Sequence, residues 1–153
     1  MSAFLTTRSA LIVLTLVIAV GLGCKPQSAV DETQGDPFEQ MMVIQQCYFD
    51  YAIKNKKAPS SKEDLAAGFQ SSGYEPSALL KSPRDGQPFV ILWGVMPDLQ
   101  STSPVVLGYE SSSVGNARMV MTTMGVVTML EDTFQKATFP EGHAAPNNLP
   151  TSN

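Results

Sequence analysis

Histidine, cysteine and clustered basic residues are scarce in this sequence. Its 153 residues include one His, two Cys, and ten Lys and Arg against fourteen Asp and Glu. Zinc sites of the usual kind need several Cys or His at ligand spacing, so no such site is expected. Nucleic-acid binding needs clustered basic side chains facing phosphates, and a net charge of −4 therefore argues against a nucleic-acid partner.

Candidate catalytic side chains are equally few. The single histidine, His143, lies in a Pro-rich tail, where a solvated side chain is a better interpretation than a general base. The adjacent acids Glu131 and Asp132 stand at a predicted helix start, where they stabilise the helix dipole. We therefore expect no enzymatic activity, no catalytic residue and no cofactor. A degenerate hydrolase is an alternative that this residue inventory does not favour.

Oxygen ligands for calcium are also sparse. A calcium site needs about six to eight oxygens and usually several carboxylates. The best candidates are the acids Asp98 and Glu110 together with the hydroxyl groups of Ser111 to Ser113. Two separated acids do not favour a site, and no bound metal is expected.

The N-terminal apolar run is shorter than the roughly 20 residues that a membrane-spanning helix needs. It extends from Ala10 to Cys24, its leader carries Arg8 as the only charged side chain, and small residues precede the cysteine. A basic leader, an apolar core and small residues before a cut site are typical of an export signal. We therefore predict a signal peptide at residues 1–23.

The end of this run resembles the lipobox of bacterial lipoproteins. It reads Gly21-Leu22-Gly23-Cys24, with Gly21 where those proteins usually carry Leu, Val or Ile. The resemblance implies cleavage between Gly23 and Cys24, followed by acylation of Cys24, which would anchor the mature chain to a membrane. Ordinary cleavage near residues 19–23 and an uncleaved anchor helix stay open as alternatives.

Composition divides the rest of the chain into three parts. Residues 24–35 are polar and include Pro and Gly, which predicts a flexible linker behind the lipid anchor. Residues 36–139 carry the apolar patterns of one domain with a single core. Residues 140–153 are rich in Pro, Asn and Ala and predict a disordered tail.

A long helix is predicted to begin at Asp36-Pro37, where Asp caps free backbone N–H groups and Pro fits the first turn. Apolar residues follow at spacings of mainly three and four as far as Ile53. The apolar surface that these residues form around the helix is wider than the ~100° stripe of a plain surface helix. We therefore expect part of the surface to stay available to a partner, with Phe38, Met42, Phe49 and Ile53 as the interaction face.

Short strands are predicted in the second half of the chain. Strand composition occurs at residues 89–93, 105–110, 117–122 and 126–129, separated by turns that contain Gly. Short strands joined by tight turns indicate an antiparallel sheet. The predicted fold is α+β, with one long N-terminal helix packed on a small antiparallel sheet of about four strands.

Cys47, Trp93 and Tyr109 each have two interpretations. Cys47 lies among apolar helix residues and is expected to be a small buried hydrophobe, although a disulfide with Cys24 is open if Cys24 is not acylated. Trp93 and Tyr109 lie in adjacent predicted strands and are expected to form an aromatic pair. An aromatic platform for glycans is the alternative.

A long helix followed by a small antiparallel sheet, behind an apolar N-terminal segment, resembles type IV pilins and type II secretion pseudopilins. Residues 58–65 are similar to the segment after the spine helix of the major pseudopilins, and residues 85–89 to their turn before the first strand. The stretch from Arg118-Met119-Val120 through Gly125 to Phe134 is similar to the C-terminal hairpin of pilin-like proteins common in planctomycetes.

Two departures from that family limit what the resemblance implies. Prepilins carry a Gly-Phe pair at their cleavage site and a Glu five residues into the mature helix, and this chain has neither. It also has Thr123-Met124-Gly125 where the planctomycete hairpin usually has Asp-Gly. The missing Glu registers one subunit against the next in pili, so the resemblance implies a pilin-like domain carried on a lipid anchor.

These patterns together predict an exported, lipid-anchored protein of the cell envelope that faces the periplasm or exterior. Its expected role is that of a non-catalytic assembly or interaction component, with the membrane and pilin or secretion-system proteins as partners. Two alternatives stay open: a glycan- or ligand-binding envelope lipoprotein, and a membrane-anchored pseudopilin with an uncleaved N-terminal helix.

Overall fold

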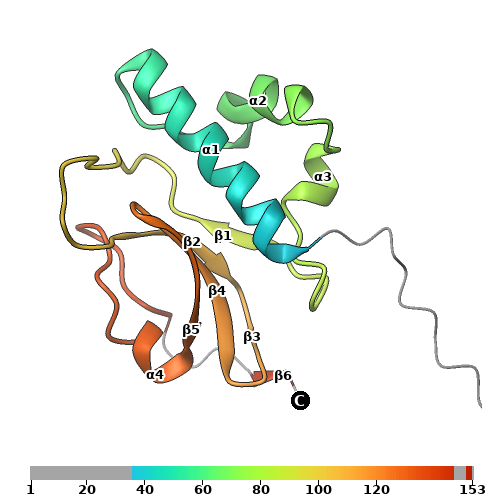
Figure 1. Cartoon of the computed structure of the whole chain (residues 1–153), viewed down its shortest axis with the longest axis vertical. Coiled ribbons are helices and arrows are strands. Elements are labelled where there is room, and N and C mark those ends of the chain that lie inside the picture. Colours follow the sequence, from blue (N-terminus) through green and yellow to red (C-terminus); the bar gives the residue numbers. More distant parts are fainter. Residues whose placement is uncertain (1–35, 147–150, 153) are drawn as a thin grey trace, which may run out of the picture. The chain divides into compact units, whose positions relative to one another are not determined.

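The computed structural model describes residues 36–146 and 151–152 (Figure 1). The predicted signal peptide, the Gly23–Cys24 cleavage site and the linker at residues 24–35 lie outside the described residues. In chain order the elements are α1 (Pro37–Asn55), η1 (Lys62–Leu65), α2 (Ala66–Ser71), α3 (Pro76–Leu79), β1 (Phe89–Ile91), β2 (Val106–Glu110), β3 (Ser113–Val114), β4 (Ala117–Thr122), β5 (Gly125–Leu130), α4 (Glu131–Phe134) and β6 (Thr151–Ser152).

Helix α1 is 19 residues long and is fixed at both ends by local chemistry. The Asp36 carboxylate accepts a hydrogen bond of 2.9 Å from the backbone N–H of Phe38, and Pro37 fills the first turn. Lys56 ends the helix in the left-handed conformation, with φ of 55°. Along the helix one face is fully buried, and its residues are Met41, Ile44, Tyr48 and Ala52.

The strands form one twisted sheet in which β4 is central. Strand β4 pairs with β2, β3 and β5, and β1 pairs with β2; all of these pairs are antiparallel. Strands β1, β2, β4 and β5 occupy the four predicted stretches. The sheet also includes the two-residue strand β3 and its parallel partner β6, which the sequence pattern did not predict. The α+β class is confirmed.

The helices α1, η1, α2 and α3 all cover the same face of the sheet (Figure 1). Helix α1 lies against β4 and β5, while η1, α2 and α3 pack along one flank of α1. Because α1 buries one side against strands and another against short helices, it needs the wide apolar surface that its sequence carries. The main core lies between these layers and includes Tyr48, Phe69, Leu79, Leu107 and Met121.

The opposite face of the sheet carries a smaller apolar cluster. Phe134 of α4 packs on Tyr109, with ring centroids 5.0 Å apart, and Phe139 packs on both rings. Ala145 also packs against this cluster. Residues 140–146, the first part of the predicted tail, contain no helix or strand, and Ala145 is the residue of this part that packs against the cluster. His143 in this segment is exposed.

Trp93 and Tyr109 do not form the expected pair. Strand β1 ends at Ile91, so Trp93 lies beyond it and stacks on Tyr48 of α1, with ring centroids 6.3 Å apart. Tyr109 belongs to the cluster on the other face of the sheet. The residue directly opposite Tyr109 in the register is Val90.

The buried hydroxyl of Tyr48 makes the free energy of unfolding decrease at alkaline pH. It donates to the carbonyl oxygens of Val95 (2.7 Å) and Leu92 (2.9 Å), and burial raises the pKa of Tyr48 to about 12. An unfolded tyrosine titrates near pH 10. The folded protein therefore keeps this proton while the unfolded chain loses it, and the stabilisation is complete below about pH 10 and lost as pH rises toward 12.

We expect the free energy of unfolding to fall by roughly 1–2 kcal/mol between pH 9.5 and pH 11.5, measured by urea denaturation. Tyr48→Phe should flatten this decline without abolishing it, because burial also raises the pKa of Tyr109. An equal decline in the wild type and in Tyr48→Phe would contradict the role given to Tyr48.

Candidate interaction surface

One mainly apolar row on α1 is only partly covered by the rest of the described chain. Phe38, Met42, Gln45, Phe49 and Ile53 are spaced by three or four and therefore lie along one side of the helix; we call this row the α1 stripe. Phe38, Met42 and Ile53 are 39%, 47% and 49% exposed, whereas Phe49 is half-buried against the main core. Three of the four side chains predicted for the interaction face are thus accessible.

The α1 stripe borders the β4–β5 hairpin. The side-chain amide of Gln45 donates a 2.7 Å hydrogen bond to the backbone carbonyl of Thr122, the last residue of β4. The short helices pack on the other flank of α1, where Gly68 of α2 approaches Cys47. On the helical wheel the core-facing residues lie between these two flanks. The stripe is consequently the flank of α1 that lies away from α2 and borders the β4–β5 hairpin.

Strand β5 is an edge strand beside this stripe. Among the described strands it pairs with β4 alone. Val127 and Leu130 are 41% and 60% exposed, and Met124 in the turn before the strand is 64% exposed. The sequence of β5, GVVTML, contains no charged residue and no proline. Val127 is directly opposite Val120, which belongs to the cluster on the other face of the sheet, so Val127 does not extend the α1 stripe. Leu130 lies on the α1 face, as Val126 of the main core does.

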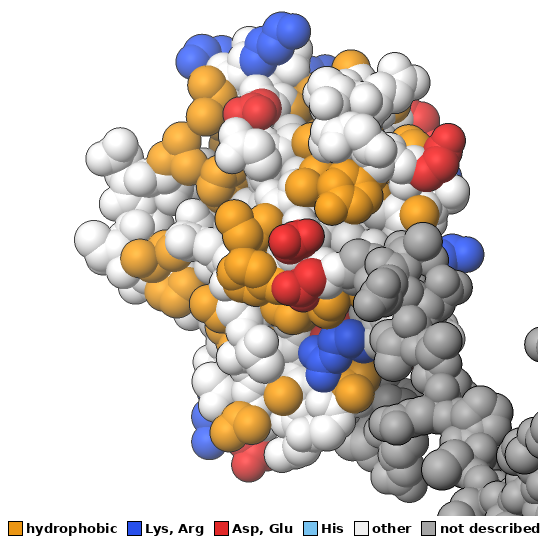
Figure 2. All heavy atoms as spheres, turned by 45° about the vertical axis from the view of Figure 1, so that its right-hand side comes forward, with side chains coloured by type: hydrophobic (Ala, Val, Ile, Leu, Met, Phe, Trp, Pro, Cys, Tyr) orange, Lys and Arg blue, Asp and Glu red, His pale blue; other side chains and the backbone are white. Residues whose placement is uncertain are grey.

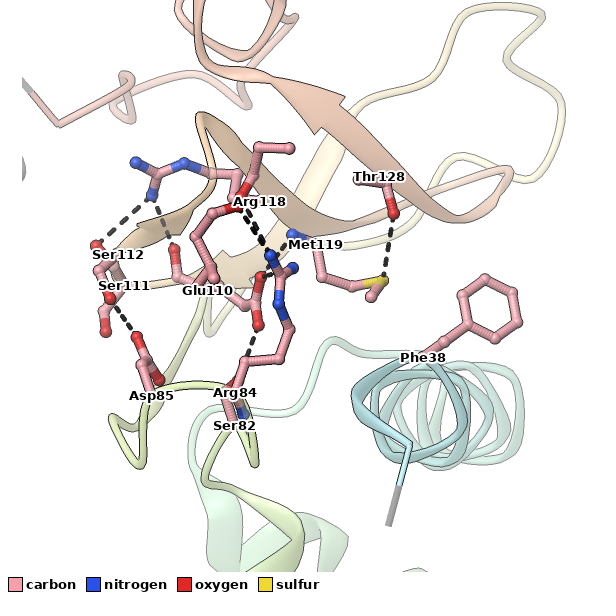
Figure 3. Close-up of polar contacts among 12 residues, drawn as sticks. Phe38, Ser82, Arg84, Asp85, Glu110, Ser111, Ser112, Arg118, Met119 and Thr128 are labelled. Atoms are coloured by element: carbon pink, nitrogen blue, oxygen red, sulfur yellow. Dashed lines mark hydrogen bonds and ion pairs between the residues drawn. The ribbon is translucent and has the colours of Figure 1, made fainter. Parts of the chain in front are cut away.

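The space-filling view shows apolar side chains reaching the surface of the domain at many points, with acidic side chains among them (Figure 2). Several basic side chains gather at the top of the same view. In the close-up, the Phe38 ring points away from the polar contacts around Glu110 (Figure 3). Phe38 of the α1 stripe is therefore separate from the polar contacts around Glu110.

A buried carboxylate, Glu110, joins the 82–88 turn to the sheet. Its side chain is fully buried and accepts hydrogen bonds from the Ser82 hydroxyl (2.7 Å), the Arg84 guanidinium (2.8 Å) and the backbone N–H of Met119 (2.8 Å) (Figure 3). Arg84 also donates to the carbonyl of Val114. Both carboxylate oxygens of Glu110 accept hydrogen bonds from within the fold. This cluster therefore connects the turn to the sheet and leaves neither oxygen unpartnered for a bound ligand.

Arg118 forms the second buried ionic contact. Its guanidinium donates to a Glu131 carboxylate oxygen (2.8 and 3.0 Å) and to the carbonyl of Glu110 (2.7 Å), and it lies 4.4 Å from the centroid of the Phe134 ring. Arg118 is fully buried. From sequence, Glu131 was expected to stabilise the dipole of a short helix, and its ion pair with Arg118 was not predicted. The position of Arg118 inside an apolar strand was the signal that it has a buried partner.

The calcium candidates are not brought together as a site. Glu110 is occupied by Arg84, and Asp98 lies in the loop after β1, where it accepts a hydrogen bond from the backbone of Gln100. Among the described residues, no group of three or more His, Cys, Asp or Glu side chains is placed to hold a metal ion.

Cys47 is buried and has no disulfide partner in the part of the chain that the structure describes. A Cβ atom added to Gly68 would lie 2.9 Å from the Cys47 sulfur, so the thiol fills the contact between α1 and α2. Burial, with a contribution from Asp50, raises the pKa of Cys47. A raised pKa keeps the thiol protonated, which is the opposite of an activated nucleophile.

Trp93 lines a shallow hollow of about 560 Å³ beside β1. Lys62, Glu63 and Lys81 stand around the same hollow, and Leu80 contributes an apolar wall. Tyr109 is on the other face of the sheet. A glycan platform made of both aromatic rings is therefore ruled out by their placement, whereas a small site at Trp93 alone is geometrically open.

No protein-family model matches this chain, and the comparisons with curated proteins and with solved structures found no similar protein. Within residues 36–146 and 151–152, no helix has both the length and the apolar character needed to cross a membrane.

Proposed function

We propose that this protein is an exported envelope protein whose pilin-like domain serves as a non-catalytic assembly or interaction component. In this proposal a lipid on Cys24 holds the mature chain to a membrane, and the domain faces the periplasm or the exterior. The α1 stripe meets a partner protein, with pilin or secretion-system components as the partners implied by the resemblance.

The observation that carries this proposal is the exposure of the α1 stripe. Helix α1 already buries one face on the sheet and a flank on the short helices, yet Phe38, Met42 and Ile53 stay 39–49% exposed along the remaining flank. A single exposed apolar side chain is ordinary, but a row of them beside an uncharged edge strand is typical of an interaction site. The polar clusters, by contrast, have their partners inside the fold.

The anchor is tested by Cys24→Ala. We expect the wild-type protein to sediment with membranes and its N-terminal peptide to carry acyl groups on Cys24, detected by mass spectrometry. Acyl chains contribute roughly 0.8 kcal/mol of membrane affinity per buried CH₂, so their loss should release most of Cys24→Ala from the membrane. An unmodified Cys24 thiol contradicts the lipid anchor. Continued membrane attachment of Cys24→Ala would indicate an uncleaved N-terminal helix, the pseudopilin-like alternative.

The surface is tested by Met42→Asp. A carboxylate in the middle of the α1 stripe should reduce partner recovery at least about tenfold, because an unpaired charge cannot be desolvated at low cost in an apolar contact. The measurement is co-purification from native membranes, quantified by mass spectrometry. Met42 is 47% exposed, so the expected loss of unfolding free energy is only about 0.5–1 kcal/mol.

Gln70→Asp supplies the matched control for this experiment. Gln70 is an exposed residue of α2, on the opposite flank of α1, and the substitution introduces the same charge into a helix. It should leave co-purification unchanged. Equal partner recovery with wild type, Met42→Asp and Gln70→Asp would remove the α1 stripe from the proposed function.

A ligand-binding lipoprotein is the second candidate, and it rests on the hollow beside Trp93. Trp93 is partly exposed there and is the only tryptophan in the chain. Binding of a cell-wall sugar should therefore change the intrinsic tryptophan fluorescence directly. No change with cell-wall oligosaccharides at millimolar concentration would leave the interaction surface as the better assignment.

A further inference from the structure

Strand β5 lacks the features by which proteins protect the edge of a sheet. Natural edge strands are usually blocked by lysine, proline, a bulge or an inward-pointing charge. Strand β5 has six residues, none charged and none proline, and its pairing with β4 is regular from Ala117↔Leu130 to Thr122↔Gly125. In an antiparallel pair about every second residue directs its N–H and C=O away from its partner. The outer side of β5 therefore offers a row of backbone groups to another strand.

We propose that a second copy of this chain pairs with β5, antiparallel and edge to edge, about a two-fold axis perpendicular to the sheet. This inference names the partner of the surface in the proposed function and rests on that surface being an interface. Antiparallel pairing of identical strands requires an axis of this direction, because the rotation must reverse the strand and keep it in the sheet.

The two-fold arrangement also explains the exposed flank of α1. Rotation about an axis perpendicular to the sheet leaves both α1 helices on the same face of the extended sheet. Gln45 of the α1 stripe is hydrogen-bonded to the backbone carbonyl of Thr122, at the end of β4, so the stripe lies on the side of α1 that borders the β4–β5 hairpin. The two stripes would therefore face each other across the paired strands. The same two-fold axis would therefore cover both the outer edge of β5 and the exposed side chains of the α1 stripe.

Size and charge favour a second copy as the occupant. A single strand pair buries less than the roughly 1,000 Å² that a stable interface needs, so a partner that covers only β5 would bind weakly. A second copy adds its own Phe38, Met42 and Ile53 to the contact. Because β5 is uncharged, two copies also meet without repulsion between the paired strands.

The test uses the whole chain, expressed with its own N-terminal segment and kept in native membranes. Thr128 is exposed near the middle of β5, and two-fold pairing brings both copies of this residue close together. Thr128→Cys should give a two-copy product with a short thiol-specific cross-linker. Gln70→Cys on α2 and the wild type, which keeps its natural cysteines, should not.

A second variant measures the strand pairing without a cross-linker. Thr128→Lys places two like charges near the two-fold axis and should weaken the dimer at least about tenfold, as seen by light scattering of the detergent-solubilised protein. Gln70→Lys should leave the dimer intact. Both substitutions are at exposed positions, so unchanged circular dichroism and thermal midpoints are the expected check on folding.

Three results would overturn the dimer paired edge to edge through β5. The first is a single-copy mass with no cross-linked product from Thr128→Cys. The second is cross-linking of Thr128→Cys to a different protein, which leaves the proposed interaction role intact and replaces the partner. The third is a dimer that persists in Thr128→Lys and is lost in Met42→Asp, which would assign the contact to the helices alone.

Discussion

Replacing Glu110 with alanine is expected to lower the free energy of unfolding by about 3–5 kcal/mol. The carboxylate is fully buried, and its removal leaves the Ser82 hydroxyl, the Met119 N–H and the Arg84 guanidinium without their shared acceptor. Native domains are stable by only about 5–15 kcal/mol, so this is a large part of the total. Urea denaturation followed by Trp93 fluorescence and by circular dichroism measures the loss.

Glu110→Gln separates the charge from the hydrogen bonds. The amide has the same shape and keeps one acceptor oxygen, but it turns an N–H₂ group toward the existing donors. A loss of about 1–3 kcal/mol is expected, smaller than for alanine. In an Arg84→Ala background, Glu110→Ala should cost less than in the wild type by about 0.5–3 kcal/mol, because the two side chains are in contact. Additive effects would mean that the Arg84–Glu110 ion pair contributes nothing.

The predictions from sequence that agree with the structure rest on local chemistry. The start of α1 follows from Asp36 as a cap and Pro37 in the first turn, both of which act within a few residues. The four main strands follow from short apolar and β-branched runs between glycine-containing turns. The interaction face predicted on this helix includes Phe38, Met42 and Ile53, which are exposed, whereas Phe49, also predicted for that face, is half-buried against the main core.

The predictions that failed concern contacts between distant segments. Trp93 was placed opposite Tyr109 on strand composition, but β1 ends at Ile91, and Trp93 turns onto Tyr48 instead. Strand ends shift by one or two residues without any change in composition, and such a shift changes which side chains meet. The contact of Ala145 with the cluster around Phe134 likewise joins distant segments, and the Pro, Asn and Ala composition of residues 140–153 does not predict it.

The buried ion pairs were missed for the same reason. Arg84 and Glu110 are 26 residues apart, and Arg118 and Glu131 are 13 apart, so no helical or strand spacing joins either pair. From sequence, Glu131 was expected to stabilise the start of a helix, and Glu110 was named only as a candidate ligand in a calcium site that was not favoured. A charged residue within an apolar strand nevertheless signals a buried partner, because an unpaired charge would not be buried there.

Arg118→Met should destabilise the domain by about 3 kcal/mol, near the lower end for loss of one partner from a buried ion pair. Methionine fills a similar volume, but the Glu110 carbonyl and the Glu131 carboxylate lose their donors, and Phe134 loses the cation above its ring. The side chain of Glu131 is 20% exposed, so partial hydration of its carboxylate limits the loss. Chemical denaturation measures this difference.

Three comparisons make the Arg118 result specific. Arg118→Lys keeps the positive charge and loses the planar fork that reaches Glu131 and the Glu110 carbonyl together, so a smaller but clear loss is expected. Lys136→Met removes an exposed cation nearby and should change stability by less than about 0.5 kcal/mol. In a Glu131→Gln background, Arg118→Met should cost less than in the wild type, because no carboxylate is left without its partner. A cost that is the same in both backgrounds would show that the arginine acts through Phe134 and the Glu110 carbonyl alone.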